Sequence, residues 1–289
     1  MAKTEQLLER LEALRQETGV ARTIFAVCPN SLSVIRASFR AAKRNNAPIY
    51  FAATLNQIDG DGGYTGMIQS QFTKMLQFEA DRVNYTGCSI VAIDHGGPWL
   101  KDKQRVEKWS TEDAMNGVKK SFEDAVLAGY DLIHVDPTVD INVAKGDVID
   151  IHVVVRRTVE LIKHVEDFRT ANNLPEISYE VGTEEVHGGL ADETTFDTFL
   201  SELKSGLAEV GLAHVWPCFI VGKVGTDLDT AIFDPEVARN LTSKVRPHGS
   251  WIKGHYTDGV SNPEEYPLSG MGAANVGPEF TISEYEALK

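Results

Sequence analysis

Eight short apolar runs recur along this chain, and nearly every one ends in polar residues. The runs are TIFAVCPN (23–30), PIYFAATLNQ (48–57), SIVAIDHG (89–96), LIHVDPT (132–138), ISYEVGTEE (177–185), WPCFIVGKVGT (216–226), SWIKGHYTD (250–258) and GAANVGPEF (272–280). Most intervals between them hold one amphipathic segment of helical length. Strand followed by helix, repeated eight times, is typical of a closed parallel barrel. The sequence therefore predicts an α/β protein with a (β/α)8 TIM-barrel fold, whose active site lies after the strands' carboxyl ends.

The chain is expected to form a single domain over 1–289, because no Pro/Ser-rich linker interrupts the alternation. Residues 1–20 form an additional amphipathic helix with an apolar stripe that includes Leu7, Leu8 and Leu11. Ser31 and Ser110 are suitable N-caps for helices over 31–45 and 110–128. Only TISEYEALK follows the last strand, and a helix usually needs about 11 residues, so the eighth helix is expected to be truncated.

Composition limits the classes of partner. The net charge of −14 argues against nucleic acid or an anionic membrane as the main partner. No apolar stretch approaches the roughly 18–20 residues of a membrane helix, and the charged amino terminus lacks the apolar core of a secretory signal. Cys28, Cys88 and Cys218 form no disulfide pattern and are expected to be buried thiols. The expected location is cytoplasmic.

Asp94 and His95 end the third apolar run and form the sharpest local signal. Side chains alternate along a strand, so one of the two faces the barrel mouth and the other sits on the loop just beyond it. A carboxylate beside an imidazole at this position suits a general base next to a metal ligand. A helix-capping aspartate with a structural histidine is the alternative.

The fifth run places Glu180 and Glu184 on the face opposite to Tyr179 and Val181. An inward carboxylate in a barrel core is costly unless it is paired or bound to a cation. Glu180 or Glu184 is therefore predicted to be a metal ligand or an acid/base.

His255 ends the seventh run. Two histidines and one carboxylate from different strands would leave coordination positions open, as a catalytic metal site requires. His134 lies in the middle of a strand and is expected to be a core histidine with a hydrogen-bond partner. His152 and His164 are expected on the surface of a helix.

Several polar residues near the strand ends are candidates for contacts with substrate hydroxyls or phosphate, although helix-capping or turn roles explain each equally well. They are Asn56, Gln57, Asp136, Lys223 and Asn275. The loop GDGGYTG is not followed by Gly-Lys-Ser/Thr, so it is not a nucleotide-binding P-loop. A sugar-phosphate kinase is accordingly disfavoured.

Six segments together, in this order, resemble one family. NQIDGDGGYTGM, AIDHGGPW, LIHVDPTVD, ISYEVGTEEVHGG, GHYTDG and NVGPEFT are similar to the accessory "Z" subunits of tagatose-1,6-bisphosphate aldolase, from galactitol and N-acetylgalactosamine pathways. The resemblance covers about residues 25–282. It implies the fold of class II, metal-dependent ketose-bisphosphate aldolases.

The resemblance also implies roles. His95 and His255 match metal-binding histidines of the class II superfamily, and Asp94 matches its catalytic aspartate. Glu184 matches the glutamate of the family's Gly-Thr-Glu turn. Glu180 falls where class II aldolases carry a glutamate near the metal, and Asn275 where they place a substrate-binding asparagine.

One departure concerns the sixth strand. Class II aldolases usually carry a further metal-binding histidine there, in a His-Gly-x-Tyr-Lys stretch, whereas this chain reads Phe-Ile-Val-Gly-Lys-Val-Gly-Thr over 219–226. The leading hypothesis is an aldolase that uses a divalent metal, with zinc expected, on a phosphorylated ketose. A ketose-phosphate C4-epimerase with the same site is one rival. A non-catalytic stabilising subunit for a separate aldolase is the other, and a homo-oligomer is a further expected assembly.

Overall fold

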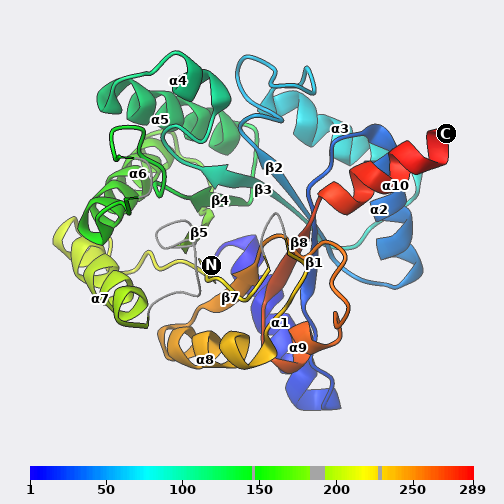
Figure 1. Ribbon diagram of the computed structural model, residues 1–289. Helices are drawn as coiled ribbons and strands as arrows, with labels where there is room; N and C mark the ends of the chain where they lie inside the picture. The colour runs from blue at the N-terminus through cyan, green and yellow to red at the C-terminus, as the bar shows by residue number, and fades with distance from the viewer. Residues whose placement is uncertain (145–146, 183–192, 227–229) are drawn as a thin grey trace.

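The computed structural model describes residues 1–289 except 145–146, 183–192 and 227–229 (Figure 1). Its eight strands are all parallel and close into a barrel in sequence order. The strands are β1 (Ile24–Val27), β2 (Ile49–Thr54), β3 (Ser89–Gly96), β4 (Leu132–Val135), β5 (Ser178–Gly182), β6 (Phe219–Val221), β7 (Trp251–Gly254) and β8 (Ala273–Val276). The predicted single-domain barrel is confirmed.

Helices alternate with these strands and surround them (Figure 1). They are α1 (Lys3–Thr18), α2 (Leu32–Arg44), α3 (Gln69–Arg82), α4 (Asp102–Val106), α5 (Thr111–Leu127), α6 (Ile151–Ala171), α7 (Glu193–Glu209), α8 (Pro235–Val245), α9 (Glu265–Leu268) and α10 (Pro278–Leu288). The predicted caps are confirmed, because the Ser31 and Ser110 side chains accept hydrogen bonds from the backbone N–H groups of Val34 and Asp113. The short α4 was not predicted. In the part of the chain that is described, no helix is both long and apolar enough to cross a membrane.

The alternation of strand side chains divides the core into two parts. Tyr179 and Val181 of β5 point outward into the larger core between barrel and helices, as predicted from their parity. A smaller core fills the barrel interior with Ile24, Tyr50, Phe219 and similar inward residues. Glu180, between two outward residues, therefore enters the interior, where an unpaired charge would be strongly unfavourable.

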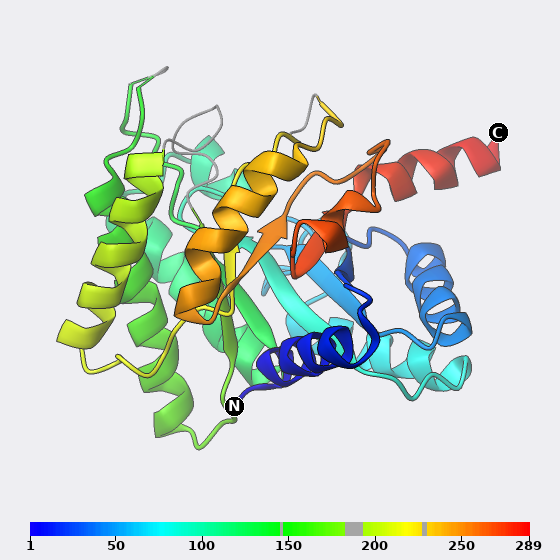
Figure 2. The same cartoon turned by 90° about the horizontal axis from the view of Figure 1, so that it is seen from below.

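Helix α1 covers the amino-terminal end of the barrel (Figure 2). Leu8 packs into the interior core. Lys3 and Glu5 bond residues at the starts of strands, Lys3 to the Ser89 carbonyl and Glu5 to the Ser178 hydroxyl. With this end covered, the opposite end is left for a site.

Replacing Leu8 by alanine should lower the free energy of unfolding by roughly 2–5 kcal/mol, because a fully buried leucine leaves a cavity. Urea denaturation measures the change. The matched control is Leu268→Ala, since Leu268 is 64% exposed and its truncation should cost no more than about 0.5 kcal/mol. An equal loss of unfolding free energy in the two variants would contradict the packing of α1 against the barrel interior.

Candidate metal centre

The end of β3 carries a β-bulge. β3 pairs with β4 in register up to Ile93 opposite Ile133 and then shifts, so that Gly96 lies opposite Val135. His95, inside the irregularity, has a φ of 49°, in the left-handed region. A bulge of this kind re-aims a side chain. Both Asp94 and His95 consequently line the pocket at the barrel mouth, which corrects the expectation that one of the two would sit on the loop beyond the strand.

Four side chains meet at this point. Asp94 and His95 come from β3, His134 from β4, and His255 directly follows β7. One ligand-type atom from each lies within 4.8 Å of the other three. The predicted meeting of Asp94, His95 and His255 is therefore observed.

His134 is buried and hydrogen-bonded, as expected of a core histidine, but it also belongs to the cluster, which was not expected. Its ring lies 5.0 Å from that of His95 and 5.2 Å from that of His255, between ring centroids. Its Nδ1 accepts a hydrogen bond from the His95 backbone N–H at 3.1 Å. A usable signal was present in the sequence, because His134 shares its strand face with Asp136.

Asp136 orients the His95 ring through its Nδ1 atom. An Asp136 oxygen lies 2.6 Å from His95 Nδ1, and the other accepts from the Thr138 hydroxyl. Burial opposes ionisation of Asp136, but His95 and Thr138 outweigh it and lower the carboxyl pKa. With Nδ1 engaged, Nε2 is the His95 nitrogen that would face an ion, as in carboxylate–histidine–metal arrangements. The structure thus gives Asp136 a supporting position behind His95; it is not among the described residues that line the pocket.

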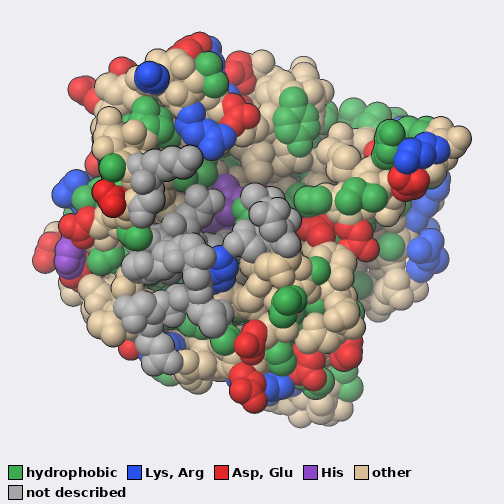
Figure 3. All heavy atoms as spheres, in the orientation of Figure 1, with side chains coloured by type: hydrophobic (Ala, Val, Ile, Leu, Met, Phe, Trp, Pro, Cys, Tyr) green, Lys and Arg blue, Asp and Glu red, His purple; other side chains and the backbone are tan. Residues whose placement is uncertain are grey.

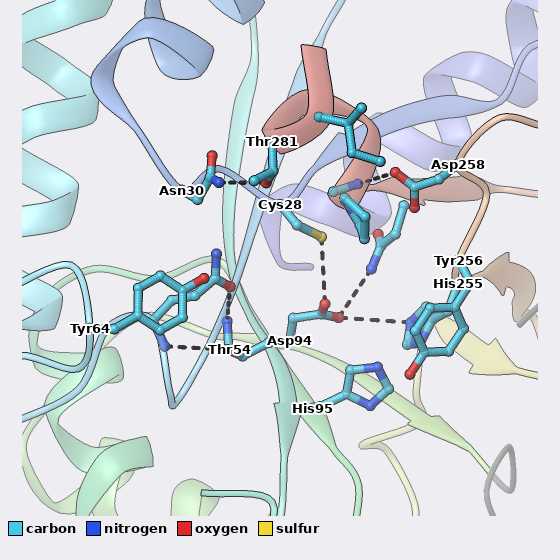
Figure 4. A pocket seen from close by; sticks show the side chains of 15 residues that line it. Cys28, Asn30, Thr54, Tyr64, Asp94, His95, His255, Tyr256, Asp258 and Thr281 are labelled. Atoms are coloured by element: carbon cyan, nitrogen blue, oxygen red, sulfur yellow. Dashed lines mark hydrogen bonds and ion pairs between the residues drawn. The ribbon is translucent and has the colours of Figure 1, made fainter. Parts of the chain in front are cut away.

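Asp94 is held by neighbours on both oxygens (Figure 4). Asn275 Nδ2 donates to one oxygen at 3.1 Å, and the Cys28 thiol donates to the other at 3.6 Å. Burial would raise the pKa of Asp94, but the charges of His95 and Lys253 hold it well below its usual range. Asp94 is thus an ionised carboxylate at the pocket floor. Cys28 was expected to be only a buried thiol. It directly follows β1 and shares the parity of the inward residues Ile24 and Ala26, which was the available signal.

Glu180 lies beneath the cluster and pairs with a lysine that the sequence interpretation missed. Lys253 Nζ lies 2.8 and 2.7 Å from the two Glu180 oxygens, and both side chains are completely buried. Burial opposes ionisation of Glu180, and Lys253 overcomes it, lowering the carboxyl pKa to about 2. Glu180 also contacts His255 Nε2 at 2.9 Å. Lys253 has the same strand parity as His255, so an inward cation was foreseeable.

The pocket above the cluster has a volume of about 440 Å³, within the range of small-molecule sites. Figure 3 shows a histidine in the recess at this end of the barrel. Amide and hydroxyl groups of Asn30, Thr54 and Gln57 line one wall, and Tyr64 of the glycine-rich loop adds a ring. Such a wall suits a hydroxylated substrate.

Only some of the residues predicted to contact substrate lie at the pocket. Gln57 and Asn275 line the pocket. Asn56 is used elsewhere: its Oδ1 accepts from the Asp102 N–H and its Nδ2 donates to the Leu100 carbonyl, so it fixes the start of α4. Lys223 is not among the described residues that line the pocket. Glu184 lies outside the described residues.

The donor set fits a divalent ion. Three imidazoles and a carboxylate are ligands that zinc accepts, at roughly 2.0–2.1 Å from the ion. Two ligands of one ion can therefore be at most about 4.2 Å apart, slightly less than the 4.8 Å spread of the four atoms. Small side-chain rotations would close this difference.

The sequence also matches a known protein family. Residues 8–289 match the model of the D-tagatose-1,6-bisphosphate aldolase subunit GatZ/KbaZ-like family. The chain belongs to this family. The resemblance inferred from six sequence segments is thereby confirmed.

Solved structures with the same fold place this GatZ/KbaZ-like chain among barrel proteins. It is similar to a probable tagatose 6 phosphate kinase from Sinorhizobium meliloti 1021, with a TM-score of 0.77, 24% identity, and coverage of 92% of this chain and 67% of that one. The YdjI aldolase from Escherichia coli K12 has a TM-score of 0.60 and 15% identity, with 96% and 83% covered. A fructose-bisphosphate aldolase from Campylobacter jejuni has a TM-score of 0.65 and 12% identity, with 98% and 78% covered.

Gly97, in the loop after β3 of this GatZ/KbaZ-like chain, packs closely against the backbone of Asp136. A Cβ at Gly97 would lie 1.7 Å from the Asp136 carbonyl oxygen. Gly97→Ala should therefore displace Asp136 and cost roughly 1–3 kcal/mol of stability, as measured by urea denaturation. Gly60→Ala is the control, since its nearest contact would be at 3.4 Å. An unchanged free energy of unfolding in Gly97→Ala would contradict the close packing of Gly97 against the Asp136 backbone.

Asp140 and Arg157 tie the loop after β4 to α6. Arg157 bonds Asp140 at 2.6 Å and lies 5.3 Å over the Trp99 ring. Burial opposes ionisation of Asp140, and Arg157 outweighs it, so the Asp140 pKa is lowered. A lowered folded-state pKa stabilises the fold above the unfolded value of about 3.9 and is lost as pH falls through the folded value.

Asp140→Asn should therefore lower the free energy of unfolding by about 1–3 kcal/mol at pH 7, with the same difference at pH 6 and a shrinking one below about pH 4. Urea denaturation of both proteins across this range measures it. A difference that grows at low pH would show that the charge of Asp140 is not what Arg157 stabilises.

Proposed function

We propose that this protein is a metal-dependent, class II-type aldolase that cleaves the C3–C4 bond of a phosphorylated ketose resembling tagatose bisphosphate. The observation that supports this most is the cluster of Asp94, His95, His134 and His255 on the floor of the pocket. His134 of β4 would supply the third imidazole, which the sixth strand does not carry; its Nδ1 would exchange the hydrogen bond from the His95 N–H for the ion. The family's description and the aldolases among similar structures agree with the proposal.

Buried charge also favours a cation here. Asp94, Asp136 and Glu180 are three buried carboxylates with lowered pKa values. Lys253 supplies one compensating positive charge. Burial opposes protonation of His95, but Asp94 and Asp136 raise its pKa, so an imidazolium supplies a second positive charge in the ion-free site. An ion that binds His95 would displace this proton and leave two negative charges. Uncompensated charge in an apolar interior is strongly unfavourable. One divalent ion would balance it.

The residues have separable roles in the cleavage. A bound divalent ion would supply Lewis-acid polarisation of the ketose carbonyl and hydroxyl oxygens. Asp94 takes the proton from the C4 hydroxyl, so that the C4–O bond becomes a carbonyl as the C3–C4 bond breaks. The electrons of that bond pass to C3 and the neighbouring carbonyl as an enediolate, and a proton delivered to C3 completes the second fragment. Asn275 and Cys28 hold Asp94 in position. Glu184, which lies outside the described residues, stays the proposed assisting acid or ligand.

His134→Ala should weaken zinc binding by more than about 100-fold, beyond the range for residues behind the ligands, and abolish release of triose phosphate. Zinc competition with a chromophoric chelator and a coupled triose-phosphate assay measure the two effects. His152→Ala is the control, because His152 lies on α6 and pairs with Glu202 at the surface. Full cleavage activity in chelator-treated protein would rule out the metal mechanism.

A stabilising, non-catalytic subunit is the second candidate function. The family description names a subunit, and the Lys253 ammonium lies 3.7 Å from Asp94, where it would compete with an ion. Protein that is inactive and zinc-free alone, yet raises the activity or half-life of a catalytic aldolase subunit, would favour this role. Release of an intact C4-epimer in place of triose phosphate would instead indicate an epimerase.

A further inference from the structure

Asp258, in the loop after β7, caps the first turn of α10 at one wall of the pocket (Figure 4). One of its oxygens accepts hydrogen bonds from the backbone N–H groups of Gly277 and Glu279, at 2.9 and 2.8 Å. The Glu279 side chain accepts in return from the Gly259 N–H at 2.9 Å. The loop and the start of α10 are therefore held together, with the Asp258 carboxylate beside the pocket.

This capping uses the hydrogen-bond donors that an anion would need. Barrels of this type frequently bind phosphate between the loops after their last two strands and the amino terminus of a short helix, where backbone N–H groups point at the ligand. Here Gly277 and Glu279 donate to Asp258 instead. Pro278 has no N–H, and the Phe280 N–H donates to the Gly277 carbonyl at 3.0 Å. Residues 277–280 therefore leave no backbone N–H for a phosphate.

The side chains around the pocket do not replace these donors with a cation. None of the described residues that line the pocket is a lysine or an arginine. Apart from the histidines of the cluster, the charged groups there are the carboxylates of Asp94 and Asp258. A phosphate placed against Asp258 would bring two negative charges together, and such like-charge contacts exclude a wrong partner.

Two acceptors on the same wall lack a hydrogen-bond partner. The second oxygen of Asp258 receives no hydrogen bond from a described residue. Asn30 donates through Nδ2 to the Thr281 hydroxyl of α10, and its buried Oδ1 has no partner. A buried acceptor without a donor is costly. A sugar hydroxyl can donate to these oxygens, whereas a phosphate dianion offers only acceptors.

We propose that Asp258 is a specificity-determining residue, which accepts a hydrogen bond from a substrate hydroxyl and keeps phosphate away from the wall at α10. The substrate is then a ketose monophosphate whose unphosphorylated hydroxymethyl end lies against Asp258, and a ketose bisphosphate is disfavoured. The choice of a ketose rests on the proposed function and narrows its substrate class. The exclusion of phosphate rests on Asp258 and α10 alone.

The test measures binding without turnover. The ligands are the hexitols made by reducing D-tagatose 6-phosphate and D-tagatose 1,6-bisphosphate, which lack the ketose carbonyl and cannot be cleaved. Calorimetric titration of the wild-type protein should show the monophosphate bound at least about 10-fold more tightly than the bisphosphate. Asp258→Asn keeps an oxygen that can cap α10 and removes the charge, so the preference should fall below about threefold through tighter binding of the bisphosphate.

Glu279→Gln is the matched control. Glu279 carries the same charge at the same end of α10 and is exposed, but it is not among the described residues that line the pocket. This variant should keep the wild-type preference. The proposal is overturned if the wild type binds both hexitols equally or binds neither, if Asp258→Asn keeps the full preference, or if Glu279→Gln loses it. A protein that shows the predicted preference but cleaves neither parent ketose phosphate would refute the proposed aldolase and leave the role of Asp258 standing.

Discussion

The buried charges inside the barrel determine how the side chains at the carboxyl ends of the strands are arranged. A carboxylate removed from water needs a cation or several hydrogen bonds close by. Glu180 obtains both from Lys253 and His255, and Asp94 has neighbours on both oxygens. The inward side chains of neighbouring strands therefore have one consistent arrangement, because moving any of them would leave a buried charge without a partner.

The bulge in β3 converts this charged layer into a site. In a regular strand Asp94 and His95 would point to opposite faces. The left-handed φ of His95 turns its ring toward the mouth, where Asp136 and the His134 ring hold it. Backbone strain of this kind persists only where the surroundings enforce it. The neighbouring strand thus enforces the geometry on which the proposed chemistry depends.

The barrel shared with aldolases does not by itself determine which strand supplies each ligand. In this chain β6 contributes Phe219 to the interior core, and β4 contributes His134 to the cluster. Histidines on different strands are equivalent for an ion at the barrel axis, since strands converge at the same end. A missing histidine on one strand is therefore compatible with a complete donor set.

The amino-acid sequence alone determined the barrel, its single domain, the N-terminal helix and the inward direction of Glu180, because these follow from local periodicity and parity. It also placed Asp94, His95 and His255 at one end. Only the tertiary structure revealed that His134 joins them, that Glu180 pairs with Lys253 and that Asn56 fixes α4. Those roles depend on strand register, a bulge and contacts between residues far apart in the chain, and none of these leaves a periodic signal in the sequence.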